Sequence, residues 1–471
     1  MTLAVPVENR KLQDARSAPG GAGHSRARLV CNDKDALAVR LALMASAVQS
    51  IDLQYYYWAP DLSGGIMMAA VLQAADRGVK VRILLDDFNA GGLDGSFSAL
   101  DTHPNVAVRL FNPLRFRLNG VLRMIDFLST FVAANNRMHN KNLIVDRRHA
   151  VVGGRNLGDP YFGLDRGTNF HDIDMHVEGQ GAAAAAAIFD AYWTATASRR
   201  VSRLIGRSPS KLARLRTQLR AMESSADAQE LLREVSRFVD AERQHNLHHV
   251  DILDIAADPP AKAVLRERPD WVGPRIEALI ASARREVVLL SPYFIPGTDG
   301  CELLERVAAR GVTVKVLTNS LAATDVVIAH SGYARYRRRL LAAGLELYEQ
   351  PATQPREKIR VFGSRKASLH TKSVLVDRGK GFLGSFNFDP RSRSINTEMG
   401  LFFEDEGLGD ALGRELDRHL AQCLRVSVQD EEMVWSDAVG NVVSRAAEPL
   451  AGPGRRLIAA VAGALPLESQ L

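Results

Sequence analysis

Residues 138–146, MHNKNLIVD, decide how the whole chain is interpreted. They contain a His-x-Lys-x4-Asp spacing that recurs at residues 370–377, HTKSVLVD. In each copy an apolar run lies between the Lys and the Asp, and such a run ending in a glycine-containing turn predicts a buried strand. Each copy is followed by a Gly and an Asn, seven and ten residues after the Asp: Gly153 and Asn156, and Gly384 and Asn387.

The His and the Lys of each motif are two residues apart. Side chains two residues apart on an extended chain point to the same side. His139 and Lys141 can therefore reach one point in space, and so can His370 and Lys372. This arrangement predicts a grip on a single phosphate group.

A longer repeat surrounds the two motifs. In each half a strand-like stretch lies between helical patterns, and the second helix closes on Arg-Gly-Val before another strand. Gly78 and Gly311 in these tripeptides are 233 residues apart, and His139 and His370 are 231 residues apart. A period held this closely indicates duplication, and the alternation of helices and strands predicts an α/β sandwich in each half.

The composition narrows the remaining alternatives. With 471 residues and 46% apolar residues, the chain is long enough for two to three domains with real cores. The net charge of +6 suits an anionic partner, lipid or nucleic acid, without choosing between them. Because Cys31, Cys301 and Cys423 lie far apart and form no CxxC, we expect reduced thiols rather than disulfides or a zinc site.

These patterns divide the chain into five segments. Residues 1–27 are expected to form a flexible tail, 28–200 and 251–425 the two α/β repeats, 201–250 a helical connector, and 426–471 a hairpin with an amphipathic tail. The sequence shows neither a secretory signal nor an apolar segment that would span a bilayer. We therefore expect a soluble or peripheral protein at the cytoplasmic face of the inner membrane.

Two stretches are candidates for lipid contact. Residues 110–131 alternate Arg with bulky apolar residues, which suits a lip for acyl chains and equally a cover helix over the sheet. Residues 455–467 are basic and then apolar, as in a helix that lies in a membrane interface or one that docks on the protein's own body. Deleting residues 455–471 is expected to weaken membrane recruitment and leave the fold intact.

The paired motifs carry the side chains that phosphodiester cleavage requires. One imidazole can attack phosphorus while a second donates a proton to the leaving alkoxide. Lys supplies positive charge to the phosphoryl oxygens, and Asn can donate hydrogen bonds to them. Two His, two Lys and two Asn are sufficient without a metal, so we expect no cofactor.

Each catalytic His also needs a partner on its other ring nitrogen. The candidates are Asp174 and Glu398, which follow Asn156 and Asn387 in strand-like surroundings. The motif residues Asp146 and Asp377 are expected first to hold strand ends and loops together. Six other histidines have no counterpart in the other repeat, and we interpret them as ordinary core or surface residues: His149, His171, His176, His245, His248 and His249. The last three would suit a metal, but they lack a Cys or carboxylate at ligand spacing.

On these residues the chain resembles the phospholipase D superfamily, whose signature is this pair of motifs with the trailing Gly and Asn. The resemblance covers roughly residues 28–425 and implies two α/β repeats in a pseudo-two-fold arrangement with one shared active site. It also implies a ping-pong reaction through a phosphohistidine, with His139 as nucleophile and His370 as general acid and base, or the reverse. The implied catalytic set is His139, Lys141, Asp146, His370, Lys372 and Asp377, and the implied phosphate-binding set is Lys141, Asn156, Lys372 and Asn387.

Within the superfamily the chain is most similar to bacterial cardiolipin synthases of the C-type. That resemblance implies transfer of a phosphatidyl group to phosphatidylglycerol from phosphatidylethanolamine or a second phosphatidylglycerol. The implied partners are phospholipid substrates and an anionic membrane surface. The resemblance leaves open whether an accessory protein is needed, and no nucleic acid is expected as a partner. The segments that carry the resemblance are residues 137–141, 152–162, 319–325, 330–336 and 384–392.

Three rival interpretations use the same fold. A lipid hydrolase or a nuclease would have identical catalytic residues, and the basic stretch 203–220 argues weakly for nucleic acid. A binding module without catalysis is disfavoured because both His-Lys pairs are intact.

Overall fold

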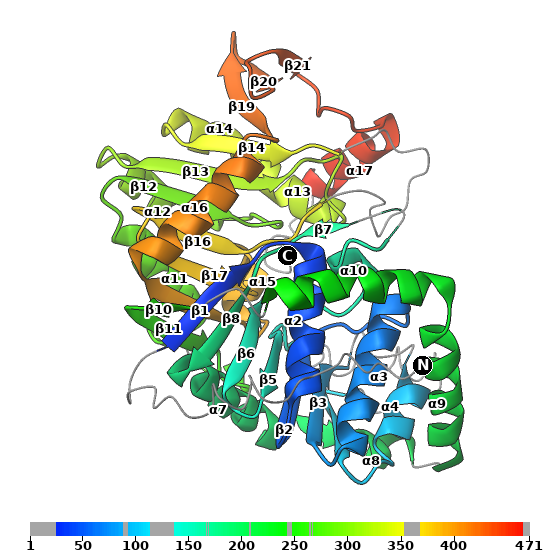
Figure 1. The fold of residues 1–471 in the computed structure, drawn as a ribbon. Helices are drawn as coiled ribbons and strands as arrows, with labels where there is room; N and C mark the ends of the chain where they lie inside the picture. Colours follow the sequence, from blue (N-terminus) through cyan, green and yellow to red (C-terminus); the bar gives the residue numbers. More distant parts are fainter. Residues whose placement is uncertain are drawn as a thin grey trace. The chain divides into compact units, whose positions relative to one another are not determined.

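The computed structural model describes residues 25–87, 93–113, 136–165, 167, 169–206, 209–242, 247–262, 265, 267–352 and 368–464 (Figure 1). The chain divides into two compact units. The first consists of Met1–Val152, Asn156–Phe162 and Asp174–Ile255, and the second of Gly153–Arg155, Gly163–Ile173 and Ala256–Leu471. Two short segments of the first sequence repeat thus belong to the second unit.

The first unit is built on a nine-stranded sheet in the order β10-β1-β8-β6-β5-β2-β3-β4-β9. Strands β2, β3 and β4 run parallel and are rich in buried aliphatic residues, as expected where helices cover a parallel sheet. The strands are β1 (Ser25–Val30), β2 (Ser50–Tyr55), β3 (Lys80–Asp86), β4 (Val106–Phe111), β5 (Asn142–Val145), β6 (His149–Gly153), β8 (Asp174–Gly179), β9 (Ser198–Arg200) and β10 (His248–Val250).

The helices of the first unit include the segment that was expected to be a connector. Helices α9 and α10 form as predicted, but they pack against α2, α3 and α4, so residues 201–250 are part of the body of this unit. The helices are α2 (Asp33–Ser46), α3 (Leu62–Asp76), α4 (Asp94–Leu100), η1 (Asp159–Tyr161), α7 (Gln180–Thr194), α8 (Val201–Ile205), α9 (Pro209–Glu223) and α10 (Ala226–Glu242).

The second unit repeats this plan in a ten-stranded sheet, β11-β18-β17-β16-β12-β13-β14-β19-β20-β21. From β11 to β19 the order matches that of β1 to β9 in the first sheet, strand for strand, which confirms the duplication. The strands are β11 (Ile252–Ala257), β12 (Glu286–Leu290), β13 (Thr313–Asn319), β14 (Glu346–Gln350), β16 (Ser373–Val376), β17 (Lys380–Gly384), β18 (Met399–Glu404), β19 (Leu424–Gln429), β20 (Glu432–Ser436) and β21 (Val442–Arg445).

Helices of the second unit bury their apolar faces against this sheet. Ile276 and Ile280 of α11 and Leu304 of α12 share one core with aliphatic residues of β12 and β13. The helices are α11 (Val272–Ala281), α12 (Gly297–Ala308), α13 (Val327–Ala334), α14 (Arg337–Ala342), α15 (Pro390–Ser394), α16 (Glu406–Leu420) and α17 (Pro453–Ala464).

The ends of the chain depart in part from expectation. Strand β1 begins at Ser25, before the boundary at residue 28 that the sequence predicted for the first repeat. The predicted C-terminal hairpin is present as β20 and β21. Of the proposed lip, Leu110 and Phe111 are buried in β4, and residues 114–131 lie outside the described residues.

Helix α17 docks on the second unit and also keeps an exposed apolar side. Ser331 of α13 donates a hydrogen bond to the carbonyl of Ala459, and buried Arg455 donates to the carbonyls of Leu321 and Thr324. A deletion that begins at Arg455 would remove these bonds, and the expectation that it leaves the fold intact stays a prediction. On the other side of the helix Leu457 and Val461 are exposed.

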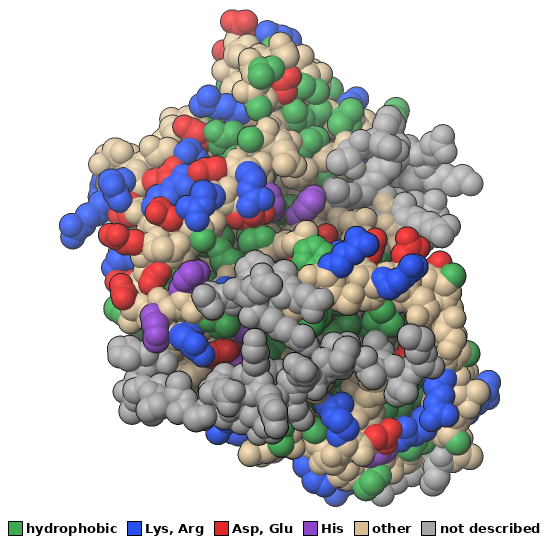
Figure 2. All heavy atoms as spheres, in the orientation of Figure 1, with side chains coloured by type: hydrophobic (Ala, Val, Ile, Leu, Met, Phe, Trp, Pro, Cys, Tyr) green, Lys and Arg blue, Asp and Glu red, His purple; other side chains and the backbone are tan. Residues whose placement is uncertain are grey.

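Figure 2 shows hydrophobic side chains at the surface of the projecting strands β19–β21, mixed with charged ones. Within the described ranges, no helix combines the length and the apolar character needed to cross a bilayer.

Candidate active site

The two motifs lie at the start of buried strands, as predicted. All four residues of β5 and all four of β16 are buried, and each strand pairs antiparallel with the first parallel strand of its sheet, β2 or β12. Lys141 and Lys372 precede these strands, and both are buried. Each His-Lys pair therefore lies directly before a strand in the interior of its sheet.

Asp146 and Asp377 have the structural role expected of them. Asp146 accepts hydrogen bonds at 2.7–3.0 Å from the backbone N–H groups of residues 48–50. Asp377 accepts them at 2.7–2.9 Å from the N–H groups of residues 284–286. Both residues have a positive φ, 50° and 52°, in the tight turn after the strand. Each carboxylate thus ties the end of its motif strand to the start of the adjacent strand.

The two lysines are held in the same way in both units. Lys141 Nζ donates to the carbonyl oxygen of His139 at 2.5 Å, and Lys372 Nζ donates to that of His370. Burial lowers the pKa of Lys372 to about 8, against the opposing charges of nearby carboxylates, Asp172 foremost. Lys372 is therefore a cation at neutral pH that lies close to losing its proton.

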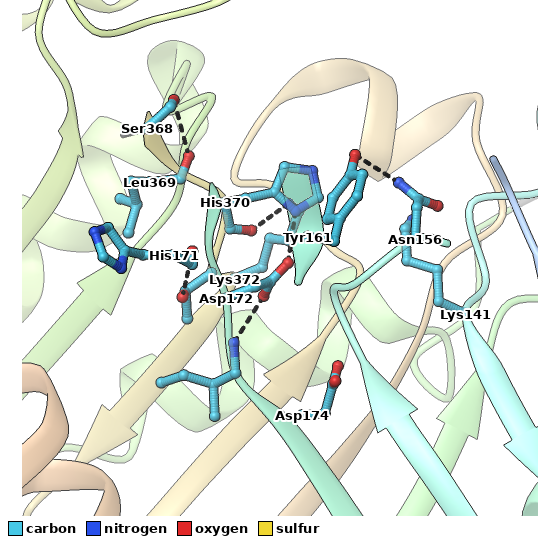
Figure 3. A network of polar contacts seen from close by, with 12 residues as sticks. Lys141, Asn156, Tyr161, His171, Asp172, Asp174, Ser368, Leu369, His370 and Lys372 are labelled. Atoms are coloured by element: carbon cyan, nitrogen blue, oxygen red, sulfur yellow. Dashed lines mark hydrogen bonds and ion pairs between the residues drawn. The ribbon is translucent and has the colours of Figure 1, made fainter. Parts of the chain in front are cut away.

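His370 has a carboxylate partner that the sequence analysis did not select. Its Nδ1 lies 2.6 Å from Asp172 Oδ2, and both side chains are buried (Figure 3). Strands β7 (Phe170–His171) and β15 (Ser368–Leu369) pair in parallel and bring the two residues together. The first repeat thus supplies the residue that orients the histidine of the second motif.

The two expected orienting residues form contacts with groups other than histidine. Asp174 forms a buried ion pair with Arg40 at 2.9 Å, so the orienting role predicted for it is corrected to Asp172 in the case of His370. Glu398 accepts hydrogen bonds from the hydroxyls of Ser385 and, at 2.9 Å, Ser392. Its role toward a histidine stays a prediction.

The sequence Asp172-Ile173-Asp174 offered two candidate carboxylates for the partner of His370. Side chains two residues apart share a side, so both Asp residues qualified and spacing could not separate them. The choice depends on where the extended pairing of β7 ends, because Asp172 follows that strand and Asp174 begins β8.

Glycines allow the close approaches around the second motif. A Cβ atom on Gly154 would lie 2.5 Å from an Asp172 carboxylate oxygen, so only glycine leaves room for that side chain. A Cβ atom on Gly384, the trailing glycine of the motif, would lie 2.4 Å from the carbonyl oxygen of Met399 on the neighbouring strand. These contacts explain why glycine is needed at both positions.

The first unit surrounds its motif with aromatic residues. The ring of Tyr56 lies edge-on to His139, with 5.1 Å between centroids, and Lys141 Nζ lies 5.5 Å from the centroid of the same tyrosine ring. Asn156 accepts from the N–H of Tyr57 and donates to the Tyr161 hydroxyl at 2.9 Å (Figure 3).

In the second unit, the side-chain oxygen of Asn387 is buried and has no hydrogen-bond partner within the described part of the chain. A buried amide in this state is suited to a polar ligand. Phosphate binding by Asn156 and Asn387 stays a prediction.

One group in the first unit has the geometry for a metal ion. His149, His176 and Glu178 place their ligand atoms within 4.8 Å of one another. Glu178 is also ion-paired with Arg26, and it lies 3.1 Å from His149 Nδ1. Since Arg26 and His149 already engage the carboxylate, we keep the expectation that the reaction needs no metal. Turnover that is unchanged by EDTA will support this expectation, and a loss that zinc restores will refute it.

Comparisons with known proteins agree with this site. The family model described as "Cardiolipin synthase, PLD-like domain" matches residues 41–193 and 276–422, and each stretch contains one motif. Cardiolipin synthase C of Escherichia coli (strain K12) is 37% identical over 398 residues, which cover 81% of this chain and 81% of that protein. Cardiolipin synthase A of Pectobacterium carotovorum is 24% identical over 422 residues, which cover 88% and 72%.

A solved structure supports the fold. The phosphatidylserine synthase of Haemophilus influenzae Rd KW20 has a TM-score of 0.58 at 14% identity, and the similarity covers 84% of this chain and 86% of that one. The two sheets with their paired motifs define a phospholipase D-like enzyme. Within that superfamily, the chain belongs to the cardiolipin synthase family with two phospholipase D-like domains.

Proposed function

We propose that this protein is a phosphatidyltransferase that makes cardiolipin through a phosphatidyl-histidine intermediate. The observation that carries the proposal is the buried pair of His370 and Asp172 beside the cationic Lys372, in a chain whose relatives include cardiolipin synthases. A carboxylate on Nδ1 fixes the tautomer that leaves Nε2 facing a substrate and stabilises the imidazolium that forms.

In the first half of the proposed reaction, His139 attacks the phosphorus of the donor lipid and a nitrogen–phosphorus bond replaces the bond to the headgroup oxygen. His370 donates its proton to the departing headgroup alkoxide. In the second half, neutral His370 takes a proton from a hydroxyl of phosphatidylglycerol, whose oxygen attacks phosphorus and releases His139. Lys141 and Lys372 balance the charge on the phosphoryl oxygens. The exchange of the two histidine roles is chemically equivalent.

Burial supports transfer over hydrolysis. The side chains of His139 and His370 are 9% and 7% exposed, which limits the access of bulk water to an intermediate that must meet an alcohol first. On the basic helix α9, Arg216 is paired with Asp76 at 2.6 Å, whereas Lys211, Arg214 and Arg220 are exposed, so a nuclease remains the alternative that the product analysis tests.

The proposed acceptor is phosphatidylglycerol, and the proposed donor is phosphatidylethanolamine or a second phosphatidylglycerol. The test is to incubate the purified protein with phosphatidylglycerol, with and without phosphatidylethanolamine, and to identify the products by mass spectrometry. Cardiolipin with released ethanolamine or glycerol supports the proposal and names the donor. Phosphatidic acid alone would establish a hydrolase instead. His139→Ala and His370→Ala are the negative controls.

We place the protein peripherally on the cytoplasmic face of the membrane, with an accessory protein as an open partner. Support comes from the exposed Leu457 and Val461 on α17 and from exposed Val439, Val442 and Val443 on the β20–β21 hairpin. Arg456 and Arg445 are exposed in the same two elements, and cationic side chains beside apolar ones favour anionic lipid surfaces.

A further inference from the structure

A side chain outside the motif forms hydrogen bonds with the backbone just before His370. Asn319, the last residue of β13, accepts a hydrogen bond from the N–H of Leu369 and donates one to its carbonyl, both at 2.9 Å. The Ser368 hydroxyl adds a third bond to the same amide oxygen at 3.3 Å. Asn319 thus holds both polar groups of the residue adjacent to the histidine.

The first unit has a counterpart at the equivalent position. Asp86, the last residue of β3, accepts a hydrogen bond from the N–H of Met138 at 2.9 Å, and Met138 immediately precedes His139. Arg137 lies 3.4 Å from the other carboxylate oxygen. Strands β3 and β13 occupy the same place in their sheets, between two parallel neighbours.

Both anchors are buried at the ends of central strands. Asp86 is fully buried and Asn319 is 2% exposed, each at the end of a central strand. The residues that they hold are in loops or at the edge of a two-stranded pairing, where the backbone would otherwise be less constrained. A hydrogen bond from a central strand therefore fixes the position of the backbone next to the histidine.

We propose that Asp86 and Asn319 are positioning residues that set the attack geometry of His139 and His370. The inference rests on the proposed roles of the two histidines and adds two residues to the site that neither motif contains. A displacement of about 1 Å at a catalytic group can lower a rate on the order of 10²-fold, so loss of either anchor is expected to act on kcat.

The chain offers closely matched controls. Gln350 ends β14, the strand next to β13. Its buried side-chain amide donates a hydrogen bond to the carbonyl of Pro351 and accepts one from the thiol of Cys423, so it does not hold the histidine segment. Asp101 is a buried carboxylate that accepts from the N–H of Val108 at 2.9 Å and pairs with Arg200, which reproduces the chemistry of Asp86 away from the motif.

The experiment compares kcat, apparent KM for phospholipid and the unfolding temperature of the full-length variants. Asn319→Ala and Asp86→Ala are expected to lower kcat roughly 10–100-fold with KM changed by less than about twofold. Asn319→Asp and Asp86→Asn keep an oxygen acceptor for the backbone N–H, so their losses are expected to be smaller. Gln350→Ala and Asp101→Asn are expected to keep kcat within about twofold, even where they lower the unfolding temperature.

Equal losses of kcat in the anchor variants and in their controls, at matched unfolding temperatures, would overturn the inference. If the alanine variants do not fold, Asn319→Asp decides for Asn319, because it replaces the donor to the Leu369 carbonyl with an acceptor, and Asp86→Leu decides for Asp86, because it carries no acceptor for the Met138 N–H. A kcat equal to that of the unsubstituted enzyme in both variants removes the positioning role. His139→Ala and His370→Ala separate this result from the parent proposal. Their continued turnover would remove the proposed function itself, whereas their inactivity with unaffected anchor variants would remove only the positioning role.

Discussion

The two units share a scaffold and differ in the surroundings of their histidines. Asp146 and Asp377 make the same three backbone hydrogen bonds, and each motif lysine bonds the carbonyl of its own histidine. The side chains that hold the backbone before each histidine are different: Asn319 bonds Leu369 before His370, and Asp86 bonds Met138 before His139.

This difference shows which parts of a duplicated site must stay alike. Strand ends and loop anchors recur because both sheets have to close in the same way. The side chain that ends the central strand can differ, because Asp86 and Asn319 both offer an oxygen that accepts from the backbone N–H before the histidine. Residues 163–173 are a further difference between the halves. They belong to the first repeat by sequence, but their contacts place them in the second unit.

Removing either imidazole tests whether the two halves are equally necessary. His139→Ala and His370→Ala are each expected to lower turnover by roughly 10⁴-fold or more, because groups that act as one unit lose nearly all function together. Because the phosphorus–nitrogen bond is acid-labile, the reaction is stopped with denaturant at alkaline pH, and mass spectrometry should then reveal a trapped phosphatidyl-histidine only in the variant that keeps the nucleophile. Activity near that of the unsubstituted enzyme in one variant would mean that one repeat acts alone.

Substitution of Asp172 is expected to have the next largest effect on kcat. Asp172→Asn keeps the shape but presents the wrong hydrogen-bonding group to Nδ1, and kcat is expected to fall on the order of 10²–10⁴-fold. Asp174→Asn is the matched comparison, since it weakens the buried pair with Arg40 and should lower the free energy of unfolding, by about 3–5 kcal/mol at most. Equal effects of the two variants on kcat would contradict the assignment of Asp172.

The pH profile compares the two lysines. Since the pKa of Lys372 is lowered to about 8, its positive charge is present below that pH and is lost as the pH rises through it. The rate is expected to fall about tenfold per unit above pH 8. Lys372→Arg stays charged and should remove this alkaline limb, whereas Lys141→Arg should retain it. An alkaline limb that persists in Lys372→Arg would assign it to another group.

The smallest expected effect concerns helix α17 of the second unit. Leu457→Ser combined with Val461→Ser removes exposed apolar surface from α17 and leaves the bonds of Arg455 in place. Partitioning onto anionic vesicles is expected to weaken about tenfold, with an unchanged unfolding temperature. Ala460→Ser, on the same helix, is the control. Unchanged vesicle binding would place the membrane contact elsewhere.

Much of the fold and the centre of the site could be predicted from the sequence. Spacing within each motif and the 231-residue offset between His139 and His370 depend only on chain order, so duplication and the buried motif strands followed directly. The role of Asp146 and Asp377 was also predictable, because a polar residue after a buried strand has to satisfy turn amides.

The partner of His370 and the two anchors depended on structure. Asp172 lies 198 residues from His370 in sequence, and no local pattern distinguishes it from Asp174. Asn319 and Asp86 end central strands in which side-chain direction follows from sheet pairing. Residues 201–250 carried helical spacing, but the faces against which those helices pack could not be derived from it.

The sequence by itself determined that this protein has two copies of one phosphate-gripping motif on two α/β repeats, because periodicity and spacing are properties of a single chain. Only the tertiary structure decided which carboxylate orients His370 and which side chains hold the histidine backbones. Those contacts join residues that are distant along the chain, and their geometry is set by strand pairing and by the space that Gly154 leaves for Asp172.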